Sequence, residues 1–346
     1  MHGFARPVPA EGGAPVKHLL DTAALDREDI EELLGLTAAF VEVSSRAVPR
    51  VPTLRGRVVA LIDEGSSRPR LSFETAAKRL SADTVAVRVS GSPVDGAESL
   101  RDTALAVEAM GADAVVVRHR SSGAPHRVAS WVDLSVINGG DGRHDHPTQA
   151  LLDCHTLRRR LGSLEGRSIA IVGDVNRSGA ARGDVHAFTT LGAEVVLVAP
   201  PTLLPPSLDG WPVTVSYDLD EVLGSADAVC LLRMSQDSVT EGLVPTLREY
   251  TARYGLTAER ARRLGDQVVL LHPDPMHRGV EIDPEVADDP RAVNVDQVRD
   301  GVAVRMAVLF RLLGSEVRAG RSAAAVAPDD AVSDPGADSR AEARHG

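Results

Sequence analysis

Residues 58–74 have the sequence VVALIDEGSSRPRLSFE. The apolar run 58–62 predicts a β-strand, and the sequence after the two arginines predicts a helix. Ser66, Ser67 and Arg68 lie where that helix begins. A helix N-terminus offers unpaired backbone N–H groups and a positive dipole end, and Arg68 adds a guanidinium that can donate two parallel hydrogen bonds. The segment therefore indicates a phosphate site. The alternative is an ordinary serine N-cap beside solvated arginines.

The alternation of strand and helix continues through both halves of the chain. Short β-branched runs separated by helical periodicity predict parallel sheets covered by helices, an α/β fold of the doubly wound class. Ligands of such sheets bind at the loops that follow the carboxyl ends of the strands. The predicted strands are 58–62, 84–89, 114–117, 135–137, 168–172, 194–199, 213–216, 228–232 and 268–271, and the main predicted helices are 72–80, 99–110, 147–161 and 301–313.

Length and composition limit the class of protein. The chain has 346 residues, enough for about two domains, and carries 38 Lys and Arg against 49 Asp and Glu, a net charge of −11. An acidic chain with 3% aromatic residues is a poor candidate for binding nucleic acid or an anionic membrane. We find no apolar run near the roughly 18 residues of a membrane span and no signal peptide. We therefore expect a cytoplasmic protein, with Cys154 and Cys230 as buried reduced thiols.

The two ends of the chain differ from the rest. Residues 1–16 are rich in Pro, Gly and Ala and have no period, which predicts a flexible arm. Residues 317–346 consist mainly of Ala, Asp, Ser, Gly and Arg without an aromatic residue. Such a segment buries too little apolar surface to order itself, so we predict a disordered tail.

The segment at 66–74 resembles the S-T-R-T-R-x-S-F-E motif of the aspartate and ornithine carbamoyltransferase family. Further matches follow in the same order, extend from about Lys17 to Leu313, and are closest to the aspartate branch. They are Arg118-His119, INGGDG at 137–142, HPTQ at 146–149, Gly173-Asp174, Leu232-Arg233-Met234 and HPDPMHRGVEI at 272–282. The D-x-W-x-S-M-G motif of the ornithine branch does not occur in the sequence.

This resemblance implies two doubly wound parallel-sheet domains with the active site between them. Residues 17–150, completed by a helix at 298–314, would bind carbamoyl phosphate, and residues 151–297 would bind the acceptor amino acid. Ser92 matches a serine of a mobile loop that reaches a neighbouring subunit's site, so the resemblance also implies a homotrimer with shared active sites. No cofactor is implied, because carbamoyl phosphate is a co-substrate.

Residue roles follow from the matched motifs. Arg118 and His146 would donate to the carbonyl oxygen where negative charge develops, and with Arg68 they are the implied catalytic residues. Gln149 would orient the carbamoyl NH2 together with backbone carbonyls near Pro273. The residues implied to bind carbamoyl phosphate are Ser66, Ser67, Arg68, Ser92, Arg118, His146, Gln149 and Pro273, and those on the acceptor side are Arg233, Ser235, Asp274 and Arg182.

Other interpretations of these residues stay open at this point. His146 could simply cap the helix that begins at Pro147, and Arg118 could be a surface arginine. His144, Asp145 and His146 are adjacent and have no further ligand nearby in sequence, so we predict no metal site. The Gly173-Asp174 turn lacks the G-x-G-x-x-G spacing, so we expect no nicotinamide cofactor.

The sequence departs from the family mainly on the acceptor side. Gly96 replaces a loop lysine that contacts both substrates in the family, and Gly179 replaces an arginine that binds an aspartate carboxylate. Arg182, one helical turn later, could substitute for that arginine. The remaining departures are Pro69 for the second threonine of the phosphate motif, Ser235 for a glutamine, and Asp274 for an apolar residue or glycine.

These departures decide the expected function. A lost charged hydrogen bond costs roughly 1.5–3 kcal/mol, so losing two should weaken aspartate binding strongly. We therefore expect an N-carbamoyltransferase whose acceptor is not free aspartate. A 2,3-diaminopropionate-type amine of specialised metabolism fits, because Asp274 could pair with its second amine. Two alternatives remain: an aspartate carbamoyltransferase of pyrimidine biosynthesis, and a non-catalytic paralogue with a binding or regulatory role.

Overall fold

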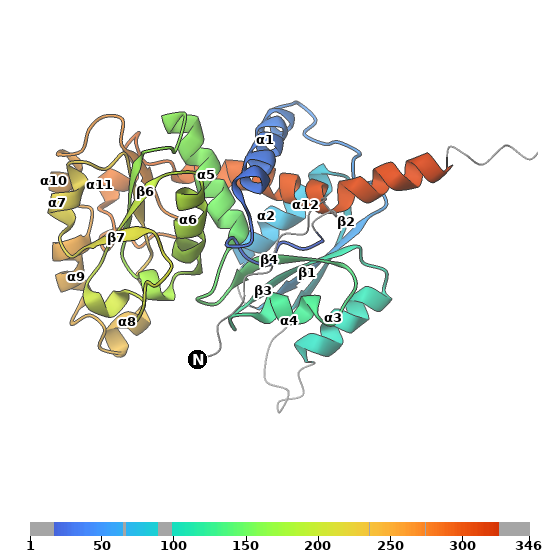
Figure 1. The fold of residues 1–346 in the computed structure, drawn as a ribbon, viewed down its shortest axis with the longest axis horizontal. Helices are drawn as coiled ribbons and strands as arrows, with labels where there is room; N and C mark the ends of the chain where they lie inside the picture. Colours follow the sequence, from blue (N-terminus) through green and yellow to red (C-terminus); the bar gives the residue numbers. More distant parts are fainter. Residues whose placement is uncertain (1–16, 65–66, 89–98, 235, 274, 325–346) are drawn as a thin grey trace, which may run out of the picture.

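The computed structural model describes residues 17–64, 67–88, 99–234, 236–273 and 275–324, and its strands form two parallel sheets (Figure 1). The first has the order β2-β1-β3-β4, with β1 (Val58–Asp63), β2 (Asp83–Arg88), β3 (Ala114–His119) and β4 (Ser135–Asp141). The second has the order β7-β6-β5-β8-β9, with β5 (Ser168–Val172), β6 (Glu194–Val198), β7 (Val213–Ser216), β8 (Ala228–Leu231) and β9 (Val269–Leu271). The predicted two-sheet α/β fold is confirmed.

Helices connect these strands and cover the sheets. In chain order they are α1 (Arg27–Ser44), α2 (Ser67–Arg79), α3 (Leu100–Ala109), α4 (Ala124–Ala129), α5 (Pro147–Leu161), α6 (Gly179–Thr190), α7 (Leu219–Leu223), α8 (Gln236–Thr240), α9 (Leu247–Tyr254), α10 (Ala258–Ala261), α11 (Pro284–Ala287) and α12 (Asn294–Ala324). Two short 3₁₀ segments, Val175–Arg177 and Pro201–Leu203, follow β5 and β6.

Strand β1, in the interior of the first sheet, is buried on both faces. Successive side chains of a strand point to opposite faces, and β1 shows this directly. Val59 and Leu61 join the core that contains Phe73 of α2, whereas Ala60 and Ile62 join a second core that includes residues of α3 and α4. This two-sided burial explains why β1 is an uninterrupted apolar run rather than an alternating one.

Helices α5 and α12 link the two halves of the molecule. In Figure 1, α5 lies between the two sheets, and its residues from Pro147 to Leu157 are all buried. Helix α12 packs on α1, α2 and α5. One continuous core contains Leu151 of α5, Ile169 of β5 and Leu309 of α12. Helix α12, near the end of the chain, therefore packs against helices that come from its first half.

Some element boundaries differ from those predicted. Strand β4 continues to Asp141, beyond 137, because Asn138 still pairs with Val117 and Asp141 with His119. Helix α12 continues to Ala324, past the residue at which we expected the tail to begin. The predicted arm at 1–16 lies outside the described residues. Helices of four to six residues, such as α4 and α10, were not predicted because they contain too few turns to show a period.

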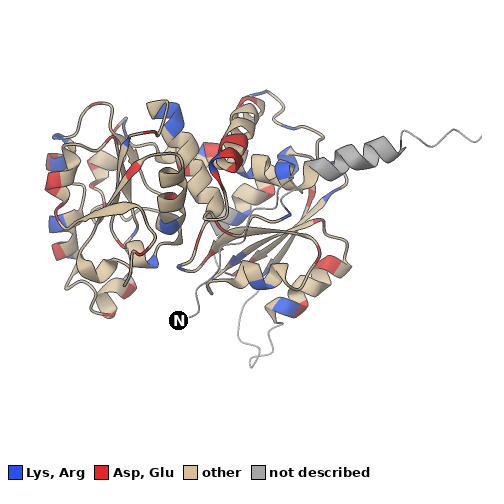
Figure 2. Ribbon diagram, in the orientation of Figure 1, with Lys and Arg blue, Asp and Glu red and all other residues tan. Residues whose placement is uncertain are grey.

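The surface carries charges of both signs, and both cysteines lie inside the fold. Figure 2 shows acidic and basic residues interspersed over both halves. Across the part of the chain that the structure describes, no helix is both long and apolar enough to cross a membrane. Cys154 and Cys230 are buried thiols, as predicted.

Candidate active site

Arg118 and His146 converge at the carboxyl ends of the first sheet's strands. Arg118 lies near the end of β3, and its Nη1 donates to the carbonyl oxygen of Gly139 at 2.8 Å. Gly140 has a φ of +113°, and a Cβ there would lie 2.6 Å from Arg118 Nη1 and 3.4 Å from His146 Cδ2. Only glycine lets both side chains approach the same point of the backbone.

His146 does not act as a helix cap. It occupies the N-cap position of α5, but its side chain makes no capping hydrogen bond. Its Nδ1 is buried and has no hydrogen-bond partner among the described residues. Desolvation of the ring, together with the positive charges of Arg118 and Arg305, holds the pKa of His146 well below its usual value. The imidazole is therefore neutral at pH 7 and can donate one N–H to a substrate oxygen.

Two buried aspartates anchor the loop that carries His146. Asp141 accepts a hydrogen bond from Gly123 N–H at 2.7 Å. Asp145 accepts from Thr22 Oγ1 at 3.0 Å and from His146 N–H at 2.6 Å. The side chain of Asp145 is thus occupied within the protein. Within the described ranges, no group of three His, Cys, Asp or Glu side chains could hold a metal ion.

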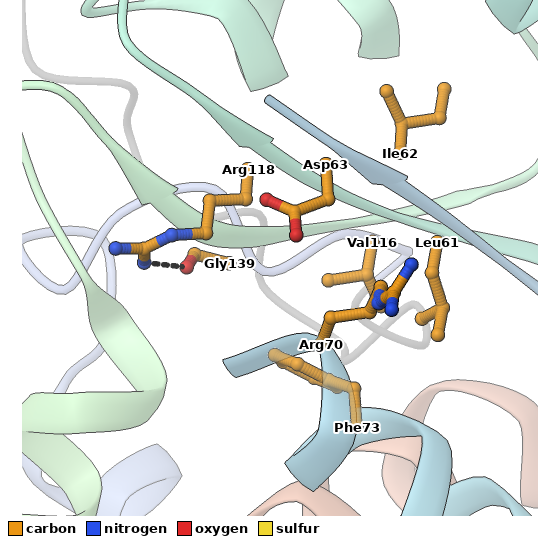
Figure 3. Close-up of a pocket in the computed structure, with 8 residues that line it drawn as sticks. All are labelled: Leu61, Ile62, Asp63, Arg70, Phe73, Val116, Arg118 and Gly139. Carbon is orange, nitrogen blue, oxygen red and sulfur yellow. Dashed lines mark hydrogen bonds between the residues drawn. The ribbon is translucent and has the colours of Figure 1, made fainter. Parts of the chain in front are cut away.

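A small cavity of about 10 Å³ lies beside Arg118 (Figure 3). In Figure 3 the carboxylate of Asp63 lies between Arg118 and Arg70. The Nε of Arg70 is buried without a hydrogen-bond partner among the described residues. The other residues around the cavity are Leu61, Ile62, Phe73, Val116 and Gly139.

A third arginine reaches this region from α12. The guanidinium of Arg305 lies 5.1 Å from the ring centre of Phe73, and its Nη1 donates to Gly301 O at 2.9 Å. Burial, with the positive charge of Arg118, lowers the pKa of Arg305 to about 10. Three arginines near one aspartate leave a net positive charge, which suits a dianion such as a phosphoryl group.

Gln149 and Pro273 come from different halves of the chain and are joined by buried side chains. Gln149 Nε2 donates to the Asp153 carboxylate at 3.1 Å. Gln297 Nε2 donates to the same carboxylate at 2.6 Å, and its Oε1 accepts from His272 N–H at 3.1 Å. Since His272 directly precedes Pro273, the two predicted carbamoyl-binding positions belong to one hydrogen-bonded unit.

The acceptor side is organised around Glu281. Arg233 follows β8 and is exposed, and its Nε donates to His277 Nε2 at 3.2 Å. The buried Glu281 carboxylate accepts from Met234 N–H at 2.6 Å and from His277 N–H at 2.8 Å. Although burial opposes it, the nearby His272 ring and the hydrogen bonds from these two amides hold the pKa of Glu281 below its ordinary value. Glu281 thus holds two backbone segments in place: that of Met234, which follows Arg233, and that of His277, which Arg233 contacts.

Arg182 and Gly179 lie on the first turn of α6. The guanidinium of Arg182 lies 5.0 Å from the ring centre of Trp211, a cation–π contact. Gly179 begins α6, and a Cβ there would meet the backbone of Asp145 at 3.2 Å. The helix therefore closes tightly on the loop that leads to His146.

Several predicted site residues lie outside the described part. These are Ser66, Ser92, Ser235 and Asp274, together with the departure at Gly96. The backbone of Ser67, Arg68 and Pro69 forms the first turn of α2, but their side chains are outside the description. The structure thus brings together Arg118 and His146, joins Gln149 to the Pro273 segment, and connects Arg233 to His277.

Sequence reasoning missed Arg70, Arg305 and Asp63. Arg70 is the second arginine of the phosphate motif, and the Arg68-Pro69-Arg70 pattern could have indicated a second phosphate contact. Arg305 is a charged residue on the buried stripe of an apolar helix, where an arginine is costly unless it serves a purpose. Asp63 ends β1, which is where ligand-binding residues of such sheets lie.

Two family models match the chain over nearly all of its described length. The aspartate/ornithine carbamoyltransferase, carbamoyl-P binding domain matches residues 17–159, and the aspartate/ornithine carbamoyltransferase, Asp/Orn binding domain matches residues 165–312. The chain belongs to the aspartate/ornithine carbamoyltransferase family, as its motifs predicted.

Individual relatives agree with this assignment. The aspartate carbamoyltransferase catalytic subunit of Acidothermus cellulolyticus is 55% identical over 311 residues, 89% of this chain and 96% of the relative. That of Thermobifida fusca is 53% identical over 303 residues, 87% of this chain and 97% of the relative. The chain is accordingly a carbamoyltransferase.

Solved structures show the same fold. Aspartate transcarbamoylase from Trypanosoma cruzi, in complex with carbamoyl phosphate and aspartate, has a TM-score of 0.76 at 28% identity, covering 86% of this chain and 97% of that one. The catalytic subunit of M. jannaschii aspartate transcarbamoylase has a TM-score of 0.75 at 31% identity, covering 87% of this chain and 99% of that one.

Proposed function

We propose that this protein transfers the carbamoyl group of carbamoyl phosphate to the amino group of aspartate and releases phosphate, as an aspartate carbamoyltransferase of pyrimidine biosynthesis. The observation that carries the proposal is the likeness over almost the whole chain, at 55% and 53% identity, to catalytic subunits named for that reaction. From the departures at Gly96 and Gly179 we expected an acceptor other than aspartate. The proposed acceptor is now aspartate itself.

The site supplies what the reaction needs. The uncharged amine attacks the carbonyl carbon, and the carbonyl oxygen gains negative charge in the tetrahedral intermediate. Arg118 and the neutral imidazole of His146 donate to that oxygen. The C–O bond to phosphate then breaks, and the proton lost by the amine leaves with the phosphate. Arg70 and Arg305, together with Arg68 in the proposed role, stabilise the departing dianion.

The assembly and the division into domains belong to the same proposal. Residues 17–150 with 298–314 form the carbamoyl phosphate domain, and 151–297 form the acceptor domain. A homotrimer would let Ser92 of one subunit complete a neighbour's site. Continuous packing of α12 on α1, α2 and α5 supports the assignment of that helix to the first domain.

A second candidate is an altered acceptor, such as a 2,3-diaminopropionate-type amine. The observation that favours it is Gly179, which contributes no charge where the family has an arginine, while the nearby Arg182 is stacked on Trp211. With Arg233 already hydrogen-bonded to His277, an acceptor with fewer carboxylates than aspartate would lose less binding energy at this site.

Labelled carbamoyl phosphate distinguishes these functions. The purified protein is incubated with aspartate, ornithine or 2,3-diaminopropionate, and label transfer is read by mass spectrometry. Transfer to aspartate at ordinary concentrations supports the first proposal. Transfer to the diamine alone replaces it with the second. Binding of carbamoyl phosphate without transfer to any amine would favour the non-catalytic alternative.

A further inference from the structure

A line of buried polar side chains crosses the molecule from the carbamoyl side to the acceptor side. It begins at Gln149 and passes through Asp153 of α5 and Gln297 of α12 to the backbone of His272. Their exposed fractions are 6%, 0%, 3% and 4% in that order. The carboxylate of Asp153 is the shared acceptor, because both glutamine Nε2 groups donate to it.

These buried polar contacts continue from His272 through Glu281 to the backbone of Met234 and His277, the two residues beside Arg233. His272 Nε2 lies 3.9 Å from Glu281 Oε2. Glu281 accepts from the backbone N–H groups of Met234 and His277. Hydrogen bonds from Gln149 to His272, followed by the contact between the His272 ring and Glu281, therefore connect Gln149, in the first half of the chain, with the loops that follow β8 and β9 in the second half.

A carboxylate at residue 153 determines which way both glutamine amides point. A carboxylate only accepts hydrogen bonds, so each glutamine must turn its NH2 toward Asp153 and its Oε1 away. For Gln297, that Oε1 receives the N–H of His272. For Gln149, the Oε1 becomes the acceptor that a carbamoyl NH2 requires.

Asp184 is a second fully buried carboxyl beside Asp153. Burial, together with the charges of Asp153 and Asp145, raises the pKa of Asp184 well above its ordinary value. The raised pKa favours the protonated form of Asp184. A buried charge of this kind is costly, and apolar residues of similar volume often replace one without loss of stability. A reason to keep the buried carboxylate of Asp153 is that it sets the direction of the Gln149 and Gln297 amides.

We propose that Asp153 and Gln297 are positioning residues for carbamoyl transfer. They turn the Gln149 carbonyl toward the carbamoyl NH2 and hold the His272–Pro273 backbone in register with it, so that the carbamoyl carbon faces the incoming amine. This inference rests on the proposed function, since it assigns the carbamoyl group to the space between Gln149 and Pro273.

The first test is Asp153→Asn. An asparagine places an NH2 where the carboxylate has its second oxygen, so it removes the second acceptor of Gln149 Nε2 and no longer forces both glutamines to turn their NH2 groups toward residue 153. We expect kcat to fall about 10- to 100-fold, the usual effect of removing a group that orients the reacting one. We expect carbamoyl phosphate to bind about 10-fold more weakly by calorimetry, roughly the effect of one lost hydrogen bond. Inorganic phosphate, which has no NH2, should bind unchanged.

The second test exchanges the two groups by combining Asp153→Asn with Gln297→Glu. The asparagine introduced on α5 still accepts from Gln149 and now donates to the carboxylate introduced on α12. The second oxygen of that carboxylate accepts from His272 N–H. The exchange restores the direction of the Gln149 amide, so kcat and carbamoyl phosphate affinity should return to within about fivefold of the parent protein.

The matched control is Asp227→Asn, which removes a carboxylate that accepts from Ser168 N–H and Arg167, both at 2.9 Å. It should lower the unfolding midpoint without changing kcat. The inference is overturned if folded Asp153→Asn keeps the parent kcat and carbamoyl phosphate affinity, or if the folded exchange variant recovers neither. If the parent protein carbamoylates no amine, the proposed function fails, and the comparison of carbamoyl phosphate with phosphate still decides the role of Asp153.

Discussion

His146 gains its chemical character from its surroundings. An ordinary histidine is partly protonated near neutral pH, but here desolvation and two nearby arginines keep the ring neutral. A neutral imidazole can donate its N–H to a substrate oxygen, and it forms no ion pair within the protein that would compete with this hydrogen bond. Arg118 is held beside it by its hydrogen bond to Gly139. The pair is therefore arranged before any substrate arrives.

Replacing His146 by alanine should lower kcat about 10²- to 10³-fold, because it removes a donor to the oxygen that becomes negative. Initial rates at saturating carbamoyl phosphate and acceptor measure the effect. The control is His186→Ala, a histidine with a pKa also lowered by burial that packs on Trp211. Equal loss in both variants would contradict the role assigned to His146.

Arg305 should show a conflict between stability and binding. Its guanidinium is buried, and its Nε has no hydrogen-bond partner among the described residues. Arg305→Met should weaken carbamoyl phosphate binding at least about 10-fold. Urea unfolding without ligand should show the free energy of unfolding unchanged or raised by up to about 4 kcal/mol, because a buried charge is removed.

Arg311→Met is the control on the same helix. Arg311 pairs with Asp29 and Glu32, so its loss should lower stability and leave carbamoyl phosphate binding alone. Destabilisation by Arg305→Met with unchanged binding would show that Arg305 serves the fold and not the site.

The end of β4 and the loop that joins it to α5 set the geometry of the site. Gly140→Ala would place a Cβ 2.6 Å from Arg118 Nη1 at a φ of +113°. We expect kcat to fall at least about 10-fold as the guanidinium moves. Gly210→Ala is the matched control, since Gly210 has a φ of +81° and open space around its Cβ position. Both variants should lose roughly 1–2 kcal/mol of stability from the left-handed backbone, Gly140→Ala should lose more because of the close contact, and only Gly140→Ala should lose activity in rate assays.

The same loop should make stability depend on pH through Asp145. Burial raises the pKa of Asp145 from 3.8 to about 6, against the hydrogen bonds from Thr22 and His146. A carboxyl with a raised folded-state pKa stabilises the fold at low pH, and that contribution is lost as the pH rises through about 6. Two pKa units correspond to about 3 kcal/mol.

Urea unfolding of the parent protein and Asp145→Asn at about pH 4 and about pH 7 measures this contribution. The parent should lose up to about 3 kcal/mol relative to the variant over that range. A constant difference between the two proteins would show that Asp145 titrates normally in the folded chain.

The sequence predicted the elements better than the contacts between distant ones. The ranges 147–161, 168–172 and 213–216 match α5, β5 and β7, because their apolar periods are complete within the segment. Arg118 and His146 were predicted because each lies in a local motif. The hydrogen bond between Asp153 and Gln297 joins residues 144 positions apart, and no local period or motif indicates such a contact.

At the scale of the whole molecule, the two halves should unfold together. Leu309 of α12 is fully buried in the core that also contains residues of β5. The chain has two tryptophans, Trp131 before β4 and Trp211 before β7. Trp131→Phe and Trp211→Phe therefore give proteins in which fluorescence reports one half each.

Urea unfolding curves of these two proteins should coincide. Adding Leu309→Ala to either should lower the free energy of unfolding by about 2–5 kcal/mol and move both curves by the same amount. Separate transitions, or a shift confined to the Trp131 signal, would show that α12 stabilises the first half alone.

The position of α12 has a consequence during protein synthesis. Helices α1, α2 and α5 leave the ribosome early, but α12, which covers them, is made near the end of the chain. Roughly 130 residues separate α5 from α12, which at about 5–20 residues per second is a delay of about 7–26 s. Throughout that delay the nascent chain presents the uncovered apolar faces of α1, α2 and α5 to the cell. Chaperone capture of ribosome-bound chains should therefore be greatest before residue 294 is added and fall once α12 has emerged.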